Sequence, residues 1–243
     1  MVFSFGENNF MLRIIKNKIH ILQNIYIKNN YFFKKKEYSP EDNIIAKLSK
    51  KIKNGFYVDI GAHHPLDQNN TCLLFKKGWS GVNIDINEFS IKLFKYIRPH
   101  DLNVRTIISN KNKILNLYYQ KQFSFLNTTN LKIAKKHFNN NFKTKKVRSQ
   151  TLDYLLNRSV FKNKKIDFLN IDVEGAEIEV LNGIDFKMYK PRIICIEILE
   201  AHYFKKKNRN SDLLKNNVYK FLIQKKYKRV WSCKYFRNHI FIK

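Results

Sequence analysis

Short apolar runs alternate with amphipathic stretches along most of this chain. The runs are nearly continuous, which is typical of strands that are buried on both faces of a parallel sheet. We expect strands at 56–60, 82–86, 102–108, 115–119, 166–171, 191–198, 227–231 and 240–242. Helices are expected between them, at 40–53, 70–77, 88–97, 151–156, 177–182 and 212–224.

This order of elements predicts an α/β fold with a mostly parallel sheet and helices on both of its faces. The loop between the last two strands is too short for a helical crossover, so we expect those strands to be antiparallel. The stretch 120–148 is polar, aromatic and basic and has no clear period. We therefore expect an inserted loop or lid there.

The N-terminal residues form a separate unit. Residues 1–36 are basic, and apolar side chains recur in them at helical spacing: Leu12, Ile15, Ile19, Leu22 and Ile25. A helix packed on the main domain is the expected structure, and a helix on a membrane surface is the alternative that the lysines suggest. A new helix should begin at Ser39-Pro40-Glu41-Asp42. We divide the chain into a helical extension, 1–37, and one domain, 38–243.

The chain carries a formal net charge of +28, with 47 Lys and Arg against 19 Asp and Glu. A polyanionic partner such as nucleic acid would account for such a charge. Lysine, however, supplies 38 of the 47 positive charges, and it is scattered from one end to the other. Arginine, which suits forked contacts to phosphates and bases, is sparse. We interpret the charge as a compositional bias and expect no nucleic-acid partner.

The three cysteines are far apart and lie in apolar runs, and no pair has CxxC spacing: Cys72, Cys195 and Cys233. This usage is typical of reduced thiols in the core of a cytosolic protein. The sequence contains no apolar run of about 18 residues, the length that a membrane-spanning helix needs. We expect a cytoplasmic protein, and peripheral membrane contact through residues 1–36 is the alternative.

Two strand ends predict an adenosine-type cofactor. The strand 56–60 ends at Asp59 and the turn residue Gly61, and the strand 82–86 carries Asp85 about 25 residues later, as in the first β-α-β unit of a nucleotide-binding sheet. Asp85 would accept the ribose hydroxyls. Asp59 would stabilise the turn or accept the amino group of a bound amino-acid moiety. Gly61 would let the backbone approach the ligand, where a side chain would clash.

The turn itself reads Gly61-Ala62-His63-His64-Pro65 and lacks the glycine-rich pattern that binds a pyrophosphate. A nicotinamide-dependent enzyme is therefore disfavoured. His63 and His64 flank the turn and are candidate general bases. The alternative is that they are polar loop residues that only make hydrogen bonds. Adjacent histidines diverge, which argues against a metal shared between them.

The densest acidic cluster of the chain follows the strand 166–171, with Asp172, Glu174 and Glu177 in six residues. The carboxyl end of such a strand is where α/β sheets place their active sites. These carboxylates can act as a base, cap the next helix or bind a divalent cation, although the sequence does not indicate a metal. Asp172 is our candidate for direct involvement, and Glu197 at the end of the next strand should lie beside it.

Together these segments resemble the FkbM family of S-adenosylmethionine-dependent methyltransferases. The resemblance spans about 38–200, and its segments follow the family's order: 56–65, 78–85, 151–156, 166–177 and 180–183. It implies a Rossmann-like class I methyltransferase fold with a mostly parallel seven-stranded sheet and an antiparallel last strand. It also implies S-adenosyl-L-methionine as cofactor and O-methylation of a hydroxyl on a sugar, a glycan or a related small molecule.

The resemblance also implies roles for single residues. The cofactor-binding set is Asp59, Gly61, Ala62, Asp85, Ser109 and Asp172, with Ser109 near the adenine. The loop 125–128 would lie over the substrate, and with the acidic cluster this gives the substrate set Asn127, Thr128, Glu174 and Glu197. The candidate bases are His63, His64 and Asp172. Asn170 stands where the family usually has lysine, and Pro40 stands where glutamine is common.

Two other functions fit parts of the sequence. The net charge suggests an RNA methyltransferase, which would bind RNA with a steep dependence on salt. A non-catalytic glycan-associated or membrane-associated module could also retain the fold. Such a module would bind the cofactor without turnover, or would not bind it at all.

Overall fold

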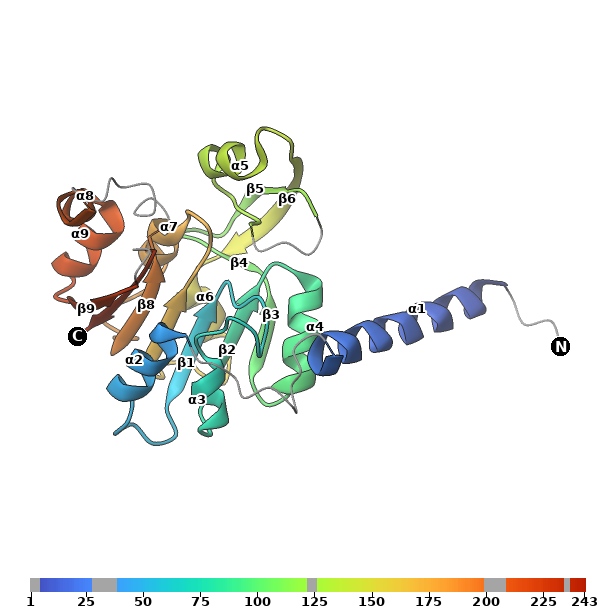
Figure 1. The fold of residues 1–243 in the computed structure, drawn as a ribbon, viewed down its shortest axis with the longest axis horizontal. Coiled ribbons are helices and arrows are strands. Elements are labelled where there is room, and N and C mark those ends of the chain that lie inside the picture. Colours follow the sequence, from blue (N-terminus) through green and yellow to red (C-terminus); the bar gives the residue numbers. More distant parts are fainter. Residues whose placement is uncertain (1–4, 28–38, 122–125, 199–208, 234–236) are drawn as a thin grey trace.

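A seven-stranded sheet organises the chain (Figure 1), as described in a computed structural model of residues 5–27, 39–121, 126–198, 209–233 and 237–243. In chain order its strands are β1 (Phe56–Ile60), β2 (Ser80–Asp85), β3 (Leu102–Arg105), β7 (Phe168–Ile171), β8 (Ile193–Glu197), β9 (Lys228–Ser232) and β10 (Asn238–Ile242). In space the order is β3-β2-β1-β7-β8-β10-β9. Strand β10 is antiparallel to both of its neighbours, β8 and β9, and all other pairs are parallel, so the predicted sheet is confirmed.

Helices cover both faces of this sheet. Phe56, Val58 and Ile60 of β1 belong to one apolar cluster, which includes side chains of α6 (Leu152–Asn157), α7 (Glu177–Asn182) and α9 (Asn217–Gln224). Tyr57 belongs to a second cluster on the opposite face, with side chains of α2 (Pro40–Leu48) and α3 (Cys72–Lys76). Helix α4 (Glu88–Ile97) packs on β2 and β3. The strands are apolar on both sides because each side meets helices.

Asparagine and serine side chains decide where helices begin. Ser39 starts α2 as predicted, since its hydroxyl accepts the backbone N–H of Asp42 at 3.1 Å and its own N–H donates to that carboxylate at 3.0 Å. Asn216 divides the expected helix 212–224 into α8 (Arg209–Lys215) and α9. Its side chain accepts backbone N–H groups of α9, so a new helix begins there.

A second, three-stranded sheet corrects two expectations. The stretch 102–108 is not one strand: β3 ends at Arg105, and β4 (Ile107–Ile108) pairs with β6 (Lys143–Gln150) in the order β4-β6-β5, where β5 is Lys113–Tyr119. The stretch 120–148 is not a plain loop either, because α5 (Leu131–Phe138) and most of β6 lie within it. Most side chains of β6 are exposed on both faces, so the strand has no apolar period to reveal it.

The N-terminal helix packs on the domain only at its end. Helix α1 (Phe5–Leu22) projects from the domain and continues into the π-helical turn η1 (Gln23–Ile27) (Figure 1). Leu12 and Ile19 of α1 are 53% and 48% exposed, whereas Ile25 in η1 is fully buried. The expected packing of this helix on the domain is therefore limited to its last turn and η1. The boundary at residue 37 lies outside the described residues, and none of the described helices could span a membrane.

A buried arginine holds the segment that follows β1. Arg98 ends α4 and is fully buried. Its guanidinium donates to the carbonyl oxygen of Pro65 at 2.6 Å, to the side chain of Asn69 at 2.8 Å and to the hydroxyl of Thr71 at 2.8 Å. The Thr71 hydroxyl in turn donates to Asp59 Oδ2 at 2.8 Å. One cation therefore fastens three points of the loop 62–71 to the sheet.

The same guanidinium contacts a second group of polar side chains inside the sheet. Arg98 Nη1 lies 3.1 Å from the Tyr57 hydroxyl and 3.2 Å from Asn83 Oδ1. Tyr57 donates to the carboxylate of Asp101, which also accepts the backbone N–H of Gly81 and the amide of Asn83, both at 2.9 Å. Buried charges are tolerated when they are paired and hydrogen-bonded in this way.

We predict that Arg98→Met lowers the free energy of unfolding by about 3–5 kcal/mol, because it leaves buried carbonyl, hydroxyl and amide oxygens without their donor and removes the positive charge that faces the buried Asp59 and Asp101. Arg105→Met is the matched control. The Arg105 side chain is 48% exposed and pairs with Glu88 at the surface, so its loss should cost less than about 1 kcal/mol. Urea denaturation measures both. Equal losses in the two variants would contradict the structural role given to Arg98.

Candidate functional site

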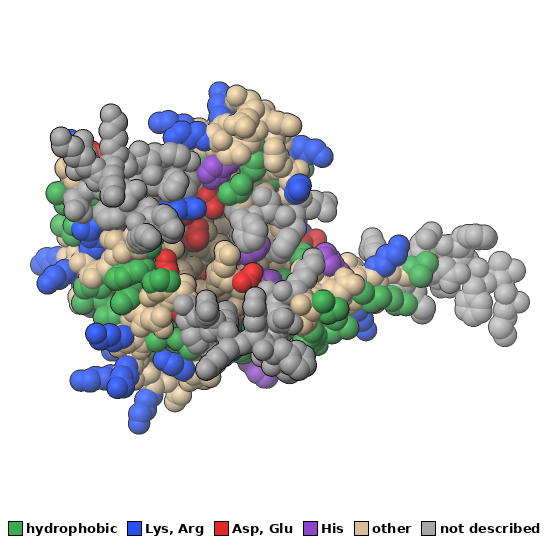
Figure 2. All heavy atoms as spheres, viewed as in Figure 1, with side chains coloured by type: hydrophobic (Ala, Val, Ile, Leu, Met, Phe, Trp, Pro, Cys, Tyr) green, Lys and Arg blue, Asp and Glu red, His purple; other side chains and the backbone are tan. Residues whose placement is uncertain are grey.

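A cavity of about 910 Å³ opens at the carboxyl ends of β1, β2, β7 and β8. The strand order reverses between β1 and β7, since the chain builds outward from β1 to β3 on one side and from β7 to β8 on the other. Ligands of open α/β sheets bind at such a switch point. Figure 2 shows acidic side chains in the hollow of this face and Lys and Arg side chains around it.

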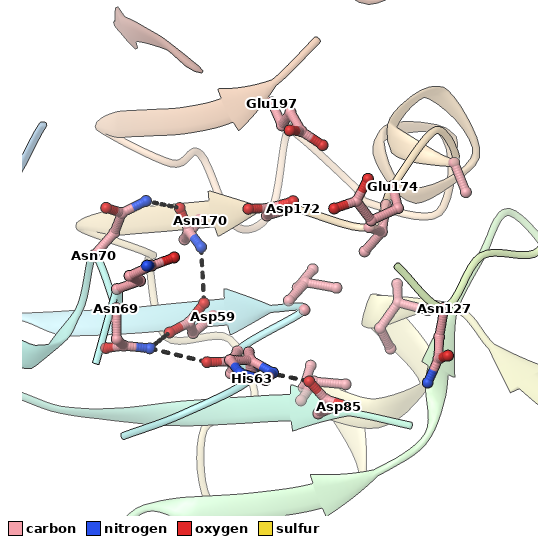
Figure 3. Close-up of a pocket in the computed structure, with 18 of the residues that line it drawn as sticks. Asp59, His63, Asn69, Asn70, Asp85, Asn127, Asn170, Asp172, Glu174 and Glu197 are labelled. Atoms are coloured by element: carbon pink, nitrogen blue, oxygen red, sulfur yellow. Dashed lines mark hydrogen bonds between the residues drawn. The ribbon is translucent and has the colours of Figure 1, made fainter. Parts of the chain in front are cut away.

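Asp59 is fully buried at the end of β1, and its carboxylate accepts three hydrogen bonds from side chains of the protein (Figure 3). It accepts hydrogen bonds from Asn170 Nδ2 at 2.9 Å, Asn69 Nδ2 at 2.9 Å and Thr71 Oγ1 at 2.8 Å. Burial raises the pKa of Asp59, and these three donors oppose that shift. Of the two roles foreseen for Asp59, this geometry favours the ordering of the turn.

Asn170 stands where the family usually has a lysine, and in the structure it links neighbouring elements through hydrogen bonds. Its Nδ2 donates to Asp59, and its Oδ1 accepts from Asn70 Nδ2 at 2.9 Å (Figure 3). A neutral amide therefore joins β7, β1 and the start of α3. Asn69 and Asn70 were not among the predicted site residues, because no local pattern marks two asparagines in a loop.

Gly61 is required, but for a different reason from the one expected. Its φ is +82°, and a Cβ atom added to it would lie 1.7 Å from the carbonyl oxygen of Asp172. The clash is thus with the backbone that leaves β7, whatever ligand is bound. The N–H groups of Gly61 and Ala62 both donate to the carbonyl oxygen of Ile84, at 2.9 and 3.1 Å. The turn is therefore fastened to the ends of β2 and β7 together.

Asp85 ends β2 with both carboxylate oxygens held by backbone donors. Oδ2 accepts the N–H of His63 at 2.9 Å, and Oδ1 accepts the N–H of Asn87 at 2.6 Å. Burial raises the pKa of Asp85 to about 6, although these N–H groups lower it. The carboxylate is therefore ionised at neutral pH. Each oxygen keeps accepting capacity for a ligand hydroxyl, as a ribose-binding carboxylate needs.

The two histidines of the turn point to different surroundings. His63 lines the cavity, and burial lowers its pKa to about 4, so its ring is neutral at physiological pH and only a weak base. The ring of His64 is buried away from the cavity lining. Its Nδ1 accepts the backbone N–H groups of Leu66 and Asp67, at 3.1 and 3.0 Å, which stabilises the loop.

Three carboxylates converge on the opposite wall of the cavity. Asp172, Glu174 and Glu197 each place an oxygen within 4.8 Å of the other two, as Figure 3 shows. Burial, together with the neighbouring carboxylates, raises the pKa of Glu174 and of Glu197 to about 8. Burial, followed by repulsion from Glu197, raises the pKa of Asp172 as well. The structure thus brings together three of the residues that the sequence singled out.

Arg237 is a cation beside these carboxylates, and it was not predicted. Its Nε donates to Glu197 Oε1 at 2.7 Å, its Nη2 donates to the same oxygen, and Nη2 lies 3.8 Å from Glu174 Oε1. His137 Nδ1 is 4.0 Å from Glu174 Oε2, but burial lowers the pKa of His137 and leaves the ring neutral. Arg237 had no sequence signal because it is one basic residue among many near the C-terminus.

Glu174 and Glu177, two of the carboxylates that the sequence offered as caps of the next helix, have different roles. Glu177 is 4% exposed, and its Oε1 accepts the backbone N–H of Gly175 at 2.9 Å, so it stabilises the loop before α7. Glu174 adopts a left-handed φ of 53° and points into the cavity (Figure 3). One of the pair is therefore structural and the other belongs to the site.

The second sheet and its connections form the remaining wall. Asn127 and Leu117 line the cavity, whereas Thr128 is 1% exposed and lies outside the lining. The Thr128 hydroxyl donates to the carbonyl oxygen of Glu174 at 2.7 Å, which fastens this region to the loop after β7. Phe125, the first residue of the expected substrate loop, lies outside the described residues.

Ser109 also lies outside the cavity lining, and it is 2% exposed. A Cβ atom on Gly183 would lie 2.2 Å from the carbonyl oxygen of Ser109, so this residue packs against the end of α7. Residues that precede it, Ile107 and Ile108, line the cavity instead and give it an apolar surface.

Comparison with known proteins identifies the family. The model of the methyltransferase FkbM domain matches residues 59–232, which is more than half of the chain. The chain belongs to the FkbM methyltransferase family. The family match and the sheet topology confirm the predicted family and the Rossmann-like α/β fold, and the family supports a methyltransferase activity.

A solved structure, the methyltransferase FkbM from Methylobacillus flagellatus KT, is similar to this FkbM family member. The two are 12% identical with a TM-score of 0.42, and the match covers 88% of this chain and 46% of that one. This chain thus spans about half the length of that protein. No curated protein sequence matches this chain.

The contact between Gly61 and β7 can be tested with a matched pair of variants. Gly61 and Gly78 have nearly equal φ values, +82° and +83°, but a Cβ atom at Gly78 would meet nothing within 4 Å. Gly78→Ala should therefore cost about 1–2 kcal/mol, the strain of a left-handed backbone alone. Gly61→Ala should cost more than about 3 kcal/mol, because the backbone must also move. Urea denaturation of both would contradict this account if the two losses were equal.

Proposed function

We propose that this FkbM family member binds S-adenosyl-L-methionine in the cavity at the carboxyl ends of β1 and β2. We further propose that it transfers the methyl group to a hydroxyl of a sugar, a glycan or a related small molecule. Asp85 is the single observation that carries the cofactor assignment. Its ionised carboxylate is fixed by the N–H groups of His63 and Asn87 beside the Gly61 turn, where two hydroxyls of a ribose can donate to it.

The surroundings of Asp85 support the same cofactor. Ile107 and Ile108 offer an apolar surface for an adenine, and Gly61 and Ala62 expose backbone beside Asp172 for the methionine portion. The single glycine of the turn suits a cofactor without phosphates, since no pyrophosphate has to approach a helix N-terminus. The cavity of about 910 Å³ lies at the upper end of ligand-site volumes, so a cofactor and a small acceptor can occupy it together.

The acidic wall supports a role for Asp172 in the chemistry. A sulfonium is a good leaving group, so much of the acceleration comes from holding the acceptor hydroxyl in line with the methyl group. A carboxylate whose pKa is raised by burial is a stronger base than an ordinary one. Asp172 is therefore a better candidate for the proton acceptor than His63, whose pKa is lowered to about 4.

An RNA acceptor is the alternative that the net charge of +28 suggests. The acceptor side of the cavity, however, carries Asp172, Glu174 and Glu197; any of these that is ionised repels the phosphates of a nucleic acid, and any that is protonated offers them no positive charge. A neutral polyhydroxyl acceptor meets no such repulsion, and carboxylates accept hydrogen bonds from its hydroxyls. The acidic wall therefore favours a sugar over RNA.

Calorimetric titration with S-adenosylhomocysteine tests the cofactor assignment. We expect saturable binding to the wild type and an affinity at least about tenfold weaker in Asp85→Asn, because an amide cannot accept both ribose hydroxyls as the carboxylate does. Glu88→Gln is the matched control, since Glu88 is exposed three residues further on, and its affinity should be unchanged. Absence of binding to the wild type would contradict the proposal.

The same titration has a pH control. Because the pKa of Asp85 is about 6, its ionised form is lost as the pH falls through that value. The wild-type affinity should therefore fall between about pH 7 and about pH 5, and the affinity of Asp85→Asn should fall less over this range.

Transfer of a labelled methyl group tests the acceptor. A labelled methyl group supplied on the cofactor should appear in sugar-containing products. Label in RNA would support the alternative acceptor.

A further inference from the structure

The acidic wall of the cavity has the dimensions of a cation site. Asp172 follows β7, Glu174 stands two residues later in the loop, and Glu197 ends β8, and one oxygen of each lies within 4.8 Å of the other two (Figure 3). Two oxygens on opposite sides of a calcium ion are separated by about 4.6–5.2 Å, and adjacent ligands lie closer. The three oxygens can therefore reach one ion with side-chain adjustments.

The described side chains around this group do not balance its negative charges. Among the residues that the structure describes, these three carboxylates face one guanidinium, that of Arg237, so the ionised group of four side chains carries two excess negative charges. Arg237 contacts Glu197 through Oε1 only. The other oxygen, Glu197 Oε2, is buried without a hydrogen-bond partner in the described part of the chain, and the Glu197 side chain is only 2% exposed.

Glu174 repeats this situation on the other side of the cluster. Its Oε2 is also buried without a hydrogen-bond partner among the described residues. A buried carboxylate oxygen without a donor or a cation destabilises the folded protein, so we expect a ligand to bind both oxygens. The backbone already holds Glu174 in place, because Thr128 donates to its carbonyl oxygen and its φ is fixed at 53°.

We propose that Asp172, Glu174 and Glu197 bind one divalent cation that prefers oxygen ligands, such as Mg²⁺, Mn²⁺ or Ca²⁺. Carboxylates are the ligands that these hard ions select, and one divalent charge neutralises the excess of the group. The role of the ion rests on the proposed function: coordination positions left open toward the cavity would bind hydroxyl oxygens of the acceptor and orient them. The ion would lower the pKa of Asp172, and it would also lower the pKa of a hydroxyl bound to it, so proton transfer from that hydroxyl to Asp172 is retained. The substrate class that fits is an acceptor with neighbouring hydroxyls, such as a sugar ring.

Titration of the full chain with Mn²⁺, followed by the paramagnetic resonance signal of the free ion, tests this site. We expect one saturable site per chain in the wild type. Glu197→Gln should weaken it by at least about tenfold, since it keeps the shape of the side chain and removes its charge. Glu88→Gln, an exposed acid outside the cavity, should bind Mn²⁺ as the wild type does. Glu174→Gln serves as a second variant should Glu197→Gln fail to fold.

Titration with S-adenosylhomocysteine separates this inference from the proposed function. The cofactor analogue should change the Mn²⁺ affinity by less than about threefold. If the analogue displaces Mn²⁺, the cation site is overturned, because the carboxylates would then bind the amino group of the cofactor instead of an ion. Binding of the analogue without any Mn²⁺ site would also overturn the inference and leave the cofactor assignment standing. Mn²⁺ affinities that are equal in the wild type, Glu197→Gln and Glu174→Gln would overturn it too.

Discussion

The buried guanidinium of Arg98 is the constraint on which the cavity depends. A charge with no access to water must be met by acceptors, and in this fold three of the acceptors belong to the loop 62–71. That loop also supplies Asn69 and Thr71 to Asp59, which fixes the end of β1. The geometry of the turn at Gly61 therefore follows from a cation at the far end of α4.

The turn at Gly61 also fixes Asp85, the proposed ribose-binding residue. Gly61 and Ala62 donate to the end of β2, and the next N–H, that of His63, donates to the carboxylate of Asp85. The path from Arg98 to Asp85 thus runs through hydrogen bonds between side chains and backbone. A carboxylate held in this way is pre-organised for a ligand, because no conformational freedom remains to be lost on binding.

The cavity wall is acidic although the chain as a whole is strongly basic. The protein carries a formal charge of +28, yet the cavity wall gathers Asp172, Glu174 and Glu197 beside the guanidinium of Arg237. Burial keeps these carboxylates from the screening that water gives, which raises the pKa of Glu174 and of Glu197 to about 8. The surface charge therefore says little about what the cavity binds.

The fold and part of the site could be read from the sequence because both leave local signals. Strands buried on two faces are apolar throughout, and the acids at their carboxyl ends, Asp85, Asp172 and Glu197, must share one edge of the sheet. Arg98 and Arg237 leave no such signal, because they reach their partners only in the folded chain. Strand β6 was missed because exposed lysines replace an apolar period in it.

Residues adjacent in the sequence were the hardest to assign. His63 lines the cavity while His64 packs into the loop, and Asn127 lines it while Thr128 bonds to the backbone of Glu174. Ser109 likewise lies behind Ile108, against α7. In irregular backbone, neighbouring side chains point in different directions, and which of them faces the ligand depends on dihedral angles that no motif encodes.

The most direct test of the account is a crystal structure of the protein with S-adenosylhomocysteine. We expect the ribose hydroxyl oxygens to lie within about 3.2 Å of the Asp85 carboxylate, with the adenine against Ile107 and Ile108. A ligand bound elsewhere, or bound in the cavity with its ribose away from Asp85, would contradict the central claim that this carboxylate and its turn form the cofactor site.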